Sequence, residues 1–155
     1  MKYFTLSALL LLSAATMAQA QTDATTGATT QAQTSKLQSG PFVGRFSNKQ
    51  LDIDLDLNLY DKKVIVPGYE DEPSYGFLRG KINGLWMVMK VKKMDEKQAV
   101  VRMASEIGAD AVDVRFKALD DGAVSFEHIG DVGVKAVQGS KYVKLPKVVV
   151  FDKVR

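Results

Sequence analysis

The sequence predicts an all-β protein, a small antiparallel up-and-down β-barrel of eight to ten strands, with a two-sheet β-sandwich as the alternative. β-Branched residues dominate residues 41–155, with 18 Val and 5 Ile against 8 Leu, and such side chains suit a pleated surface better than a helix. Apolar and polar residues alternate without a break from Leu51 to Leu59, which is typical of a strand with one dry and one wet face. Asn-Gly and Asp-Gly pairs between later apolar runs are typical of hairpins.

Each further strand is predicted from a short apolar run that ends at turn residues. The strands expected, in chain order, are Phe42–Phe46, Leu51–Leu59, Val64–Pro67, Tyr75–Ile82, Leu85–Lys92, Ala99–Ala104, Val112–Leu119, Ala123–Ile129, Val134–Val137, Tyr142–Leu145 and Val148–Phe151. Strands in sequential hairpins of this kind have one apolar and one polar face. The apolar face has to be covered, either by a second sheet or by closure of the sheet into a barrel. Closure is favoured because it leaves no free sheet edge.

The connections between the strands are predicted from Gly, Pro, Asn and Asp. Asn83-Gly84 and Asp121-Gly122 are expected to form two-residue hairpin loops with positive φ at both positions. The acidic segment 68–74 is expected to be a polar loop. Gly76 and Gly80 are interpreted as kinks in a strand or as sites of close backbone approach.

Alternation along each strand assigns side chains to the two faces of the barrel. The residues expected inside are Leu51, Ile53, Leu55, Leu57, Leu59, Leu85, Met87, Met89, Val91, Ala99, Val101, Met103, Val112, Val114, Phe116, Val124 and Phe126. The residues expected outside are Asp52, Asp54, Asp56, Lys90, Lys92, Arg102, Asp113, Arg115 and Lys117. Opposite charges on neighbouring outer strands are in position to pair, and a one-residue slip would invert every assignment after it.

The first 40 residues are predicted to lie outside the barrel. Residues 1–20 have the features of a signal peptide: Lys2, an apolar stretch from Phe4 to Ala15, and Ala18-Gln19-Ala20 before an expected cleavage at Gln21. Residues 21–40 hold six Thr and four Gln and are expected to be a disordered tether. These segments predict secretion across the inner membrane to the periplasm or the extracellular space, with no membrane span.

The chain resembles the lipocalin-like small barrels through the start of its first predicted strand. That family carries Gly-x-Trp there, and in Gly44-Arg45-Phe46 of this chain Phe46 stands at the Trp position. The resemblance implies that a basic residue near the last strand, Lys153 or Arg155, packs over Phe46. It also implies a small apolar ligand in the barrel. The chain looks most like the short, uncharacterised lipocalin-like proteins that bacteria secrete.

Composition argues against most catalytic chemistry. The chain has no Cys and one His, which excludes thiolate nucleophiles, disulfides and iron–sulfur clusters and leaves little for a metal centre. The run Asp52-x-Asp54-x-Asp56 begins like a calcium loop but lacks the Gly and Glu that such a loop needs. We therefore predict a protein that is not an enzyme, with no catalytic residue, cofactor or metal. Removal of Lys2 leaves 20 basic against 18 acidic side chains, which gives no reason to expect a nucleic-acid partner.

His128 is the one imidazole that a hydrolase could use, with Ser125, Glu127 and Asp131 as its polar neighbours in the sequence. Adjacent strand positions point to opposite faces, and no Gly-x-Ser-x-Gly elbow occurs. A capped structural histidine is therefore the favoured interpretation, and the hydrolase stays a third hypothesis.

Two functions of different classes remain. The first is a secreted binding protein that holds a small apolar ligand in a barrel cavity of a few hundred Å³. The residues expected to contact this ligand are Leu55, Leu57, Met87, Met89, Met103, Phe116 and Phe126. The second is an envelope protein-binding factor, of the inhibitor or immunity type, that acts through its outer surface or loops. Its expected contact residues are Tyr69, Tyr75 and Trp86, which are predicted to lie off the leucine face or in loops. The sequence leaves the oligomeric state open.

Overall fold

A computed structural model describes residues 40–108 and 110–155. The expected signal peptide and all but the last residue of the expected tether lie outside these ranges. The described residues form twelve strands and no helix. The strands are β1 (Val43–Asn48), β2 (Ile53–Asn58), β3 (Val64–Val66), β4 (Tyr69–Ser74), β5 (Gly76–Gly80), β6 (Trp86–Met94), β7 (Gln98–Ser105), β8 (Ala111–Ala118), β9 (Val124–Ile129), β10 (Lys135–Gln138), β11 (Lys141–Lys144) and β12 (Val148–Lys153). Accordingly, no helix in these ranges is long and apolar enough to cross a membrane.

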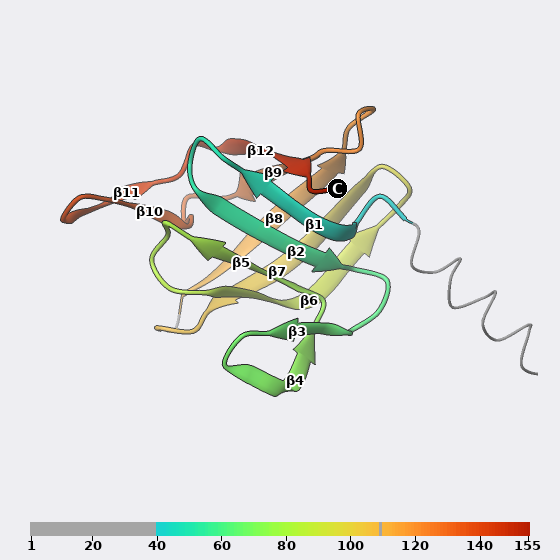
Figure 1. The fold of residues 1–155 in the computed structure, drawn as a ribbon, viewed down its shortest axis with the longest axis horizontal. Coiled ribbons are helices and arrows are strands. Elements are labelled where there is room, and N and C mark those ends of the chain that lie inside the picture. Colours follow the sequence, from blue (N-terminus) through green and yellow to red (C-terminus); the bar gives the residue numbers. More distant parts are fainter. Residues whose placement is uncertain (1–39, 109) are drawn as a thin grey trace, which may run out of the picture.

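Eight of the strands close into one antiparallel barrel, in the order β1, β2, β5, β6, β7, β8, β9, β12 and back to β1. Each barrel strand therefore pairs with the next one along the chain, which confirms the predicted up-and-down barrel and not the sandwich. Figure 1 shows two hairpins added to this meander, β3–β4 after β2 and β10–β11 after β9.

The two added hairpins lie at opposite ends of the barrel. Strands of a meander alternate in direction, so the connection that leaves β2 and the connection that leaves β9 are at different ends. In Figure 1, β3–β4 lies below β6, whereas β10–β11 extends to the left beyond the end of β5. The two hairpins of one molecule are therefore too far apart to form a single binding surface.

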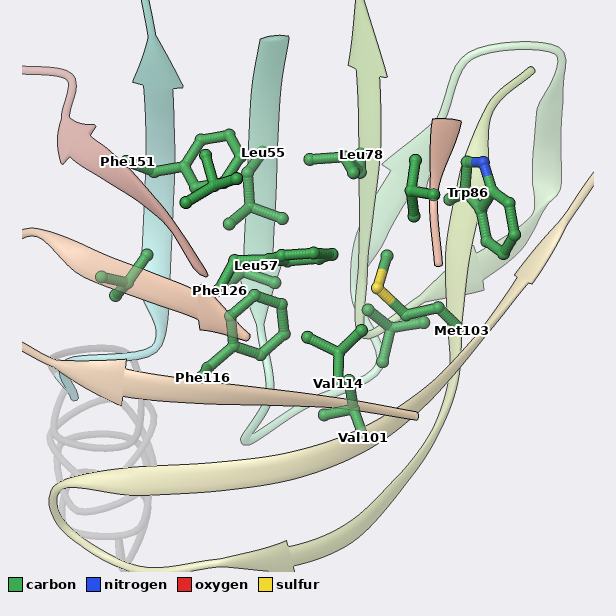
Figure 2. Packing of buried hydrophobic residues seen from close by; sticks show 14 of the residues in the cluster. Leu55, Leu57, Leu78, Trp86, Val101, Met103, Val114, Phe116, Phe126 and Phe151 are labelled. Carbon is green, nitrogen blue, oxygen red and sulfur yellow. The ribbon is translucent and has the colours of Figure 1, made fainter. Parts of the chain in front are cut away.

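The barrel interior is filled by side chains. Five phenylalanines, Phe42, Phe46, Phe116, Phe126 and Phe151, are each 0% exposed. In Figure 2 the rings of Phe116, Phe126 and Phe151 point inward toward leucines of β2. The Phe126 centroid is 5.7 Å from that of Phe116 and 6.1 Å from that of Phe151, both edge to face, an arrangement that aromatic pairs favour.

Most predicted inward positions are confirmed. The residues assigned inside on β2, β7, β8 and β9 are buried, namely Ile53, Leu55, Leu57, Ala99, Val101, Met103, Val112, Val114, Phe116, Val124 and Phe126. Leu59, just after β2, is also buried, whereas Leu51 is half-buried before that strand begins.

The first part of β6 contradicts the predicted faces. Trp86 and Val88 are buried, with 3% and 1% exposure, whereas Met89, predicted inside, is 56% exposed. Met87 is only half-buried. The register between β6 and β7 shifts from Val88 to Lys90, so Met89 is the extra residue of a bulge, and a bulge reverses the alternation.

Two predicted connections also differ. The segment expected to be a polar loop contains β4, which pairs with β3. Around Asn83-Gly84 and Asp121-Gly122 the connections run from Lys81 to Leu85 and from Leu119 to Ala123, longer than two residues. Gly84 and Gly122 have positive φ, but the preceding Asn and Asp do not. Two-residue loops of the expected type are therefore absent here.

Close backbone approach at Gly76 and Gly80 is confirmed. A Cβ at Gly80 would lie 2.3 Å from the Asp52 carbonyl oxygen, and one at Gly76 would lie 2.5 Å from that of Asp56. Both glycines also have positive φ, 123° and 157°. β5 can approach β2 at these points because neither position has a side chain.

Of the two basic residues considered for Phe46, Lys153 lies over the ring. Its Nζ is 5.8 Å from the ring centroid, and the two residues are partners in the β1–β12 register. The contact is of the cation–π type.

Candidate functional site

The residues proposed to hold an apolar ligand are mostly part of the packed core. Leu55, Leu57, Met103, Phe116 and Phe126 are at most 2% exposed and belong to one hydrophobic cluster. Met87 and Met89 point elsewhere: both line a small outer recess beside Ser74 of β4. The structure thus separates the seven residues into an interior group and an exterior pair.

Three concavities on the described surface lie outside the barrel interior. Two of them, of about 650 and 550 Å³, adjoin the β6–β7 turn around Asp95 and Gln98. The third, beside Met87 and Met89, has about 60 Å³. None of these three is lined by the interior leucines or phenylalanines.

Met103 and Met89 give a direct test of which methionine belongs to the core. We expect Met103→Ala to destabilise the protein by about 2–4 kcal/mol, because it removes a fully buried side chain and leaves a cavity. Met89→Ala is expected to change stability by less than about 0.5 kcal/mol, because this side chain is mostly in solvent. Urea unfolding of both variants checks the difference, and equal losses would contradict the faces of β6 described here.

The proposed aromatic contact patch is not formed. Trp86 is 3% exposed, and its indole Nε1 donates a hydrogen bond to the Asn83 carbonyl at 3.0 Å. Tyr75 is half-buried against the core. Tyr69 alone of the three is exposed, at 38%. The expectation that Trp86 lies off the core is therefore wrong, because the β6 bulge turns its ring inward.

His128 has a structural role in the fold. It is 2% exposed, and its Nε2 accepts a hydrogen bond from the Val134 backbone N–H at 2.9 Å. Nδ1 has no hydrogen-bond partner among the described residues. Burial lowers the pKa of His128, the Pro146 carbonyl opposes this, and the Lys144 charge adds to the lowering. The nitrogen that a general base would use is thus occupied by the backbone.

The acidic row of β2 lies on the outer wall and pairs with bases on neighbouring strands. Asp56 contacts Arg45 at 3.2 Å, Asp54 contacts Arg79 at 3.9 Å, and the preceding Asp52 contacts Lys81 at 3.1 Å. In the part of the chain that the structure describes, no group of His, Cys, Asp and Glu is arranged to hold a metal ion.

The same pairing continues around the barrel wall. Asp113 contacts Lys92 and Arg102, and these bases hold its carboxyl pKa below the usual range. Glu127 contacts Arg115 at 3.0 Å and Lys117 at 3.7 Å, with the same effect on its pKa. Exposed pairs of this kind contribute little stability, but they neutralise most of the wall.

Hairpin β10–β11 differs from the barrel wall because its basic side chains have no acidic partners among the described residues. From Gly133 to Lys147 the chain has four Lys and no Asp or Glu. None of the ion pairs within residues 40–108 and 110–155 includes Lys135, Lys141, Lys144 or Lys147. We call residues 133–147 the basic hairpin.

Two cross-strand pairs define the open face of the basic hairpin. Lys135 lies opposite Lys144, and Val137 lies opposite Tyr142. Directly opposite side chains share one face of a sheet, and like charges in that position repel. The Lys144 ammonium donates to the Asp131 carbonyl oxygen, but this backbone contact does not neutralise it. Tyr142 is 62% exposed, so the face presents an aromatic ring beside unneutralised ammonium groups.

The base of the basic hairpin is fixed to the barrel. Val134 and Leu145 are buried and share a backbone hydrogen bond of 2.9 Å. Ala136 is 7% exposed and bridges to Ile82 in the β5–β6 connection. Backbone bonds from Asn83 N–H to the Lys135 carbonyl and from Val137 N–H to the Lys81 carbonyl complete the attachment. A rigid base therefore holds a tip that extends into solvent (Figure 1).

Comparison with known proteins assigns no role to this surface. Comparison with protein-family models, with curated proteins and with solved structures finds no match to this chain. The lipocalin-like resemblance therefore stays a prediction, and the function has to be argued from the residues themselves. Sequence reasoning missed the basic hairpin as a site, although its four lysines without a nearby acid are visible in the sequence.

Proposed function

We propose that this chain is an exported, non-enzymatic binding protein that recognises an acidic protein partner through the basic hairpin. The observation that carries the proposal is a hairpin whose four lysines take part in none of the ion pairs of the described residues. Two of them, Lys135 and Lys144, share a face with the exposed ring of Tyr142. Export is part of the proposal because of the signal-like residues 1–20.

The chemistry of the basic hairpin fits a protein surface. Complementary charge speeds encounter and selects the partner, and tyrosine is enriched where interfaces are buried. Exposed Val137 and Val143 add apolar area on the two faces of the same hairpin. The mixture of ammonium groups, one ring and small aliphatic side chains suits an acidic surface with apolar positions.

The alternative, a small apolar ligand inside the barrel, stays a prediction. It requires interior rings such as Phe116 and Phe126, which are 0% exposed, to move apart. Native mass spectrometry of the protein purified without detergent tests it: a stoichiometric small molecule supports the carrier, and a bare folded mass favours recognition through the outer surface.

A defined polyanion tests the proposed surface. We expect Lys135→Gln/Lys141→Gln to weaken binding of poly-L-glutamate about tenfold at low salt, because each lost charge removes a few tenths to one kcal/mol. Neither Nζ makes an ion pair within the described ranges. Titration calorimetry gives the affinity of each protein.

The matched control is Lys49→Gln/Lys90→Gln, which removes two exposed, unpaired lysines elsewhere. It is expected to stay within about twofold of the unmodified protein. An equal loss in both double variants would mean that net charge alone attracts the polyanion, and the proposal would then be wrong.

A further inference from the structure

The opposite end of the barrel carries a hairpin of the opposite charge. From Val64 to Ser74, which spans β3 and β4, the chain has three acidic residues and no basic one. The side chains of Glu70, Asp71 and Glu72 are all exposed. We call residues 64–74 the acidic hairpin.

The acidic hairpin also presents apolar side chains beside its charges. Tyr69 is 38% exposed and Ile65 is 55% exposed. The basic hairpin has the same combination on one face, with Tyr142 and the opposite Val137 at 62% and 36%. Each surface therefore offers an aromatic ring, an aliphatic side chain and charges of one sign.

The two hairpins of one molecule are held apart by the barrel between them. The acidic hairpin follows β2 and the basic hairpin follows β9, at different ends of the meander. In Figure 1 the green β3–β4 lies below the barrel and the red β10–β11 extends to its left. A contact between such surfaces consequently joins two molecules.

We infer that the basic hairpin of one molecule binds the acidic hairpin of a second copy, head to tail. This inference rests on the proposed function, because it names one acidic partner for the same surface. Charge complementarity between the two ends selects the second copy as the occupant. Among the described residues β11 pairs with β10 alone, so its outer edge offers backbone groups with which a strand of the partner hairpin is able to pair.

Head-to-tail contact has a consequence that a symmetric dimer lacks. The interface is heterologous, so a growing assembly keeps a free basic hairpin at one end and a free acidic hairpin at the other. The species expected are dimers, trimers and longer chains that increase with concentration. Two small hairpins form a contact of the transient class, and salt at 0.5 M should weaken it about tenfold or more relative to 0.05 M.

Sedimentation velocity of the chain purified from cells that export it tests the inference with two variants. Lys135→Gln/Lys141→Gln weakens the basic hairpin, and Asp71→Asn/Glu72→Gln weakens the acidic hairpin. Glu70 is left in place because its carboxylate accepts the Gly68 N–H at 3.0 Å. Each variant alone is expected to be about tenfold weaker in self-association. An equimolar mixture should form a dimer and stop there, because only one intact pair of hairpins is available.

The control double variant Glu96→Gln/Asp120→Asn removes two exposed acids outside the acidic hairpin and is expected to associate normally. If the unmodified protein stays monomeric at low salt, or if the mixture stays monomeric while each variant is folded, the inference is overturned. Poly-L-glutamate binding shows whether only this inference fails or the proposed function fails as well. Binding that depends on the basic hairpin, in a protein that does not self-associate, leaves the proposed function standing and removes only the second copy as its partner.

Discussion

Phe126→Ala is expected to destabilise the barrel by about 3–5 kcal/mol, a large share of the roughly 5–15 kcal/mol that holds a single domain together. The ring is fully buried and has edge-to-face contacts with Phe116, Phe151 and the imidazole of His128, whose centroid is 4.8 Å away. Its removal leaves a cavity, and the three neighbouring rings cannot fill it without adopting unfavourable side-chain conformations. Urea unfolding followed through the fluorescence of the buried Trp86 measures the loss.

Tyr142→Ala is the matched control, because it truncates another aromatic ring on a mostly exposed position. A change of less than about 0.5 kcal/mol is expected for it. A loss near zero for Phe126→Ala would mean that the barrel interior tolerates empty space. That outcome would contradict a filled core and would favour the apolar-ligand alternative.

The fold was predictable because the strand with the clearest alternation, β2, is also one of the most buried strands. The alternation around Leu55 and Leu57 sets the inward face of β2, and the mixed polar and apolar positions of β7 and β8 do the same. Where polar residues occupy every second position, only one register buries the apolar set. Closure into a barrel then follows from the number of such strands.

The faces of β6 were not predictable for the opposite reason. Leu85 to Met89 is a run of five apolar residues, so alternation favours neither face there. The polar residues that appear to set the face, Lys90 and Lys92, come after the bulge. Only contacts from other strands, which the sequence does not contain, decide that Trp86 rather than Met87 is buried.

The two hairpins show which part of a surface site a sequence reveals. The segment around Glu70 and Asp71 was expected to be a loop because acidic residues and Pro are depleted in strands, yet charge is tolerated on an exposed edge. The lysines of the basic hairpin were visible as a run without acids. Their lack of ion-pair partners was not visible in the sequence, because it depends on which strands lie beside them in the fold.

Protein stability is expected to fall between pH 8 and pH 5.5 because of His128. Burial lowers the pKa of its imidazole below its ordinary value of 6.5. At pH values between the two pKa values the unfolded chain binds a proton that the folded protein does not. The stabilising contribution is therefore fully present above about pH 7 and is lost as the pH falls through 6.5 toward the folded pKa.

Protonation also has a local effect that can be measured separately. The proton would occupy Nε2, which in the folded protein accepts the Val134 N–H. Val134 is the residue before β10, so loss of this bond loosens the base of the basic hairpin. We expect hydrogen exchange at the Val134 amide to accelerate at low pH more than exchange in β7 and β8, after correction for the intrinsic rate.

His128→Phe is the variant that isolates this effect. It leaves the Val134 N–H without its acceptor, which costs about 1–3 kcal/mol, but the remaining stability should no longer depend on pH between 8 and 5.5. The chain has one His, and Asp113 and Glu127 have pKa values lowered by their basic partners, so they titrate below this window. A variant that keeps the slope of the unmodified protein would assign the titration to another group. A flat profile in the unmodified protein would show that the imidazole titrates alike in the folded and unfolded chain, contrary to its burial against Phe126 and the hairpin base.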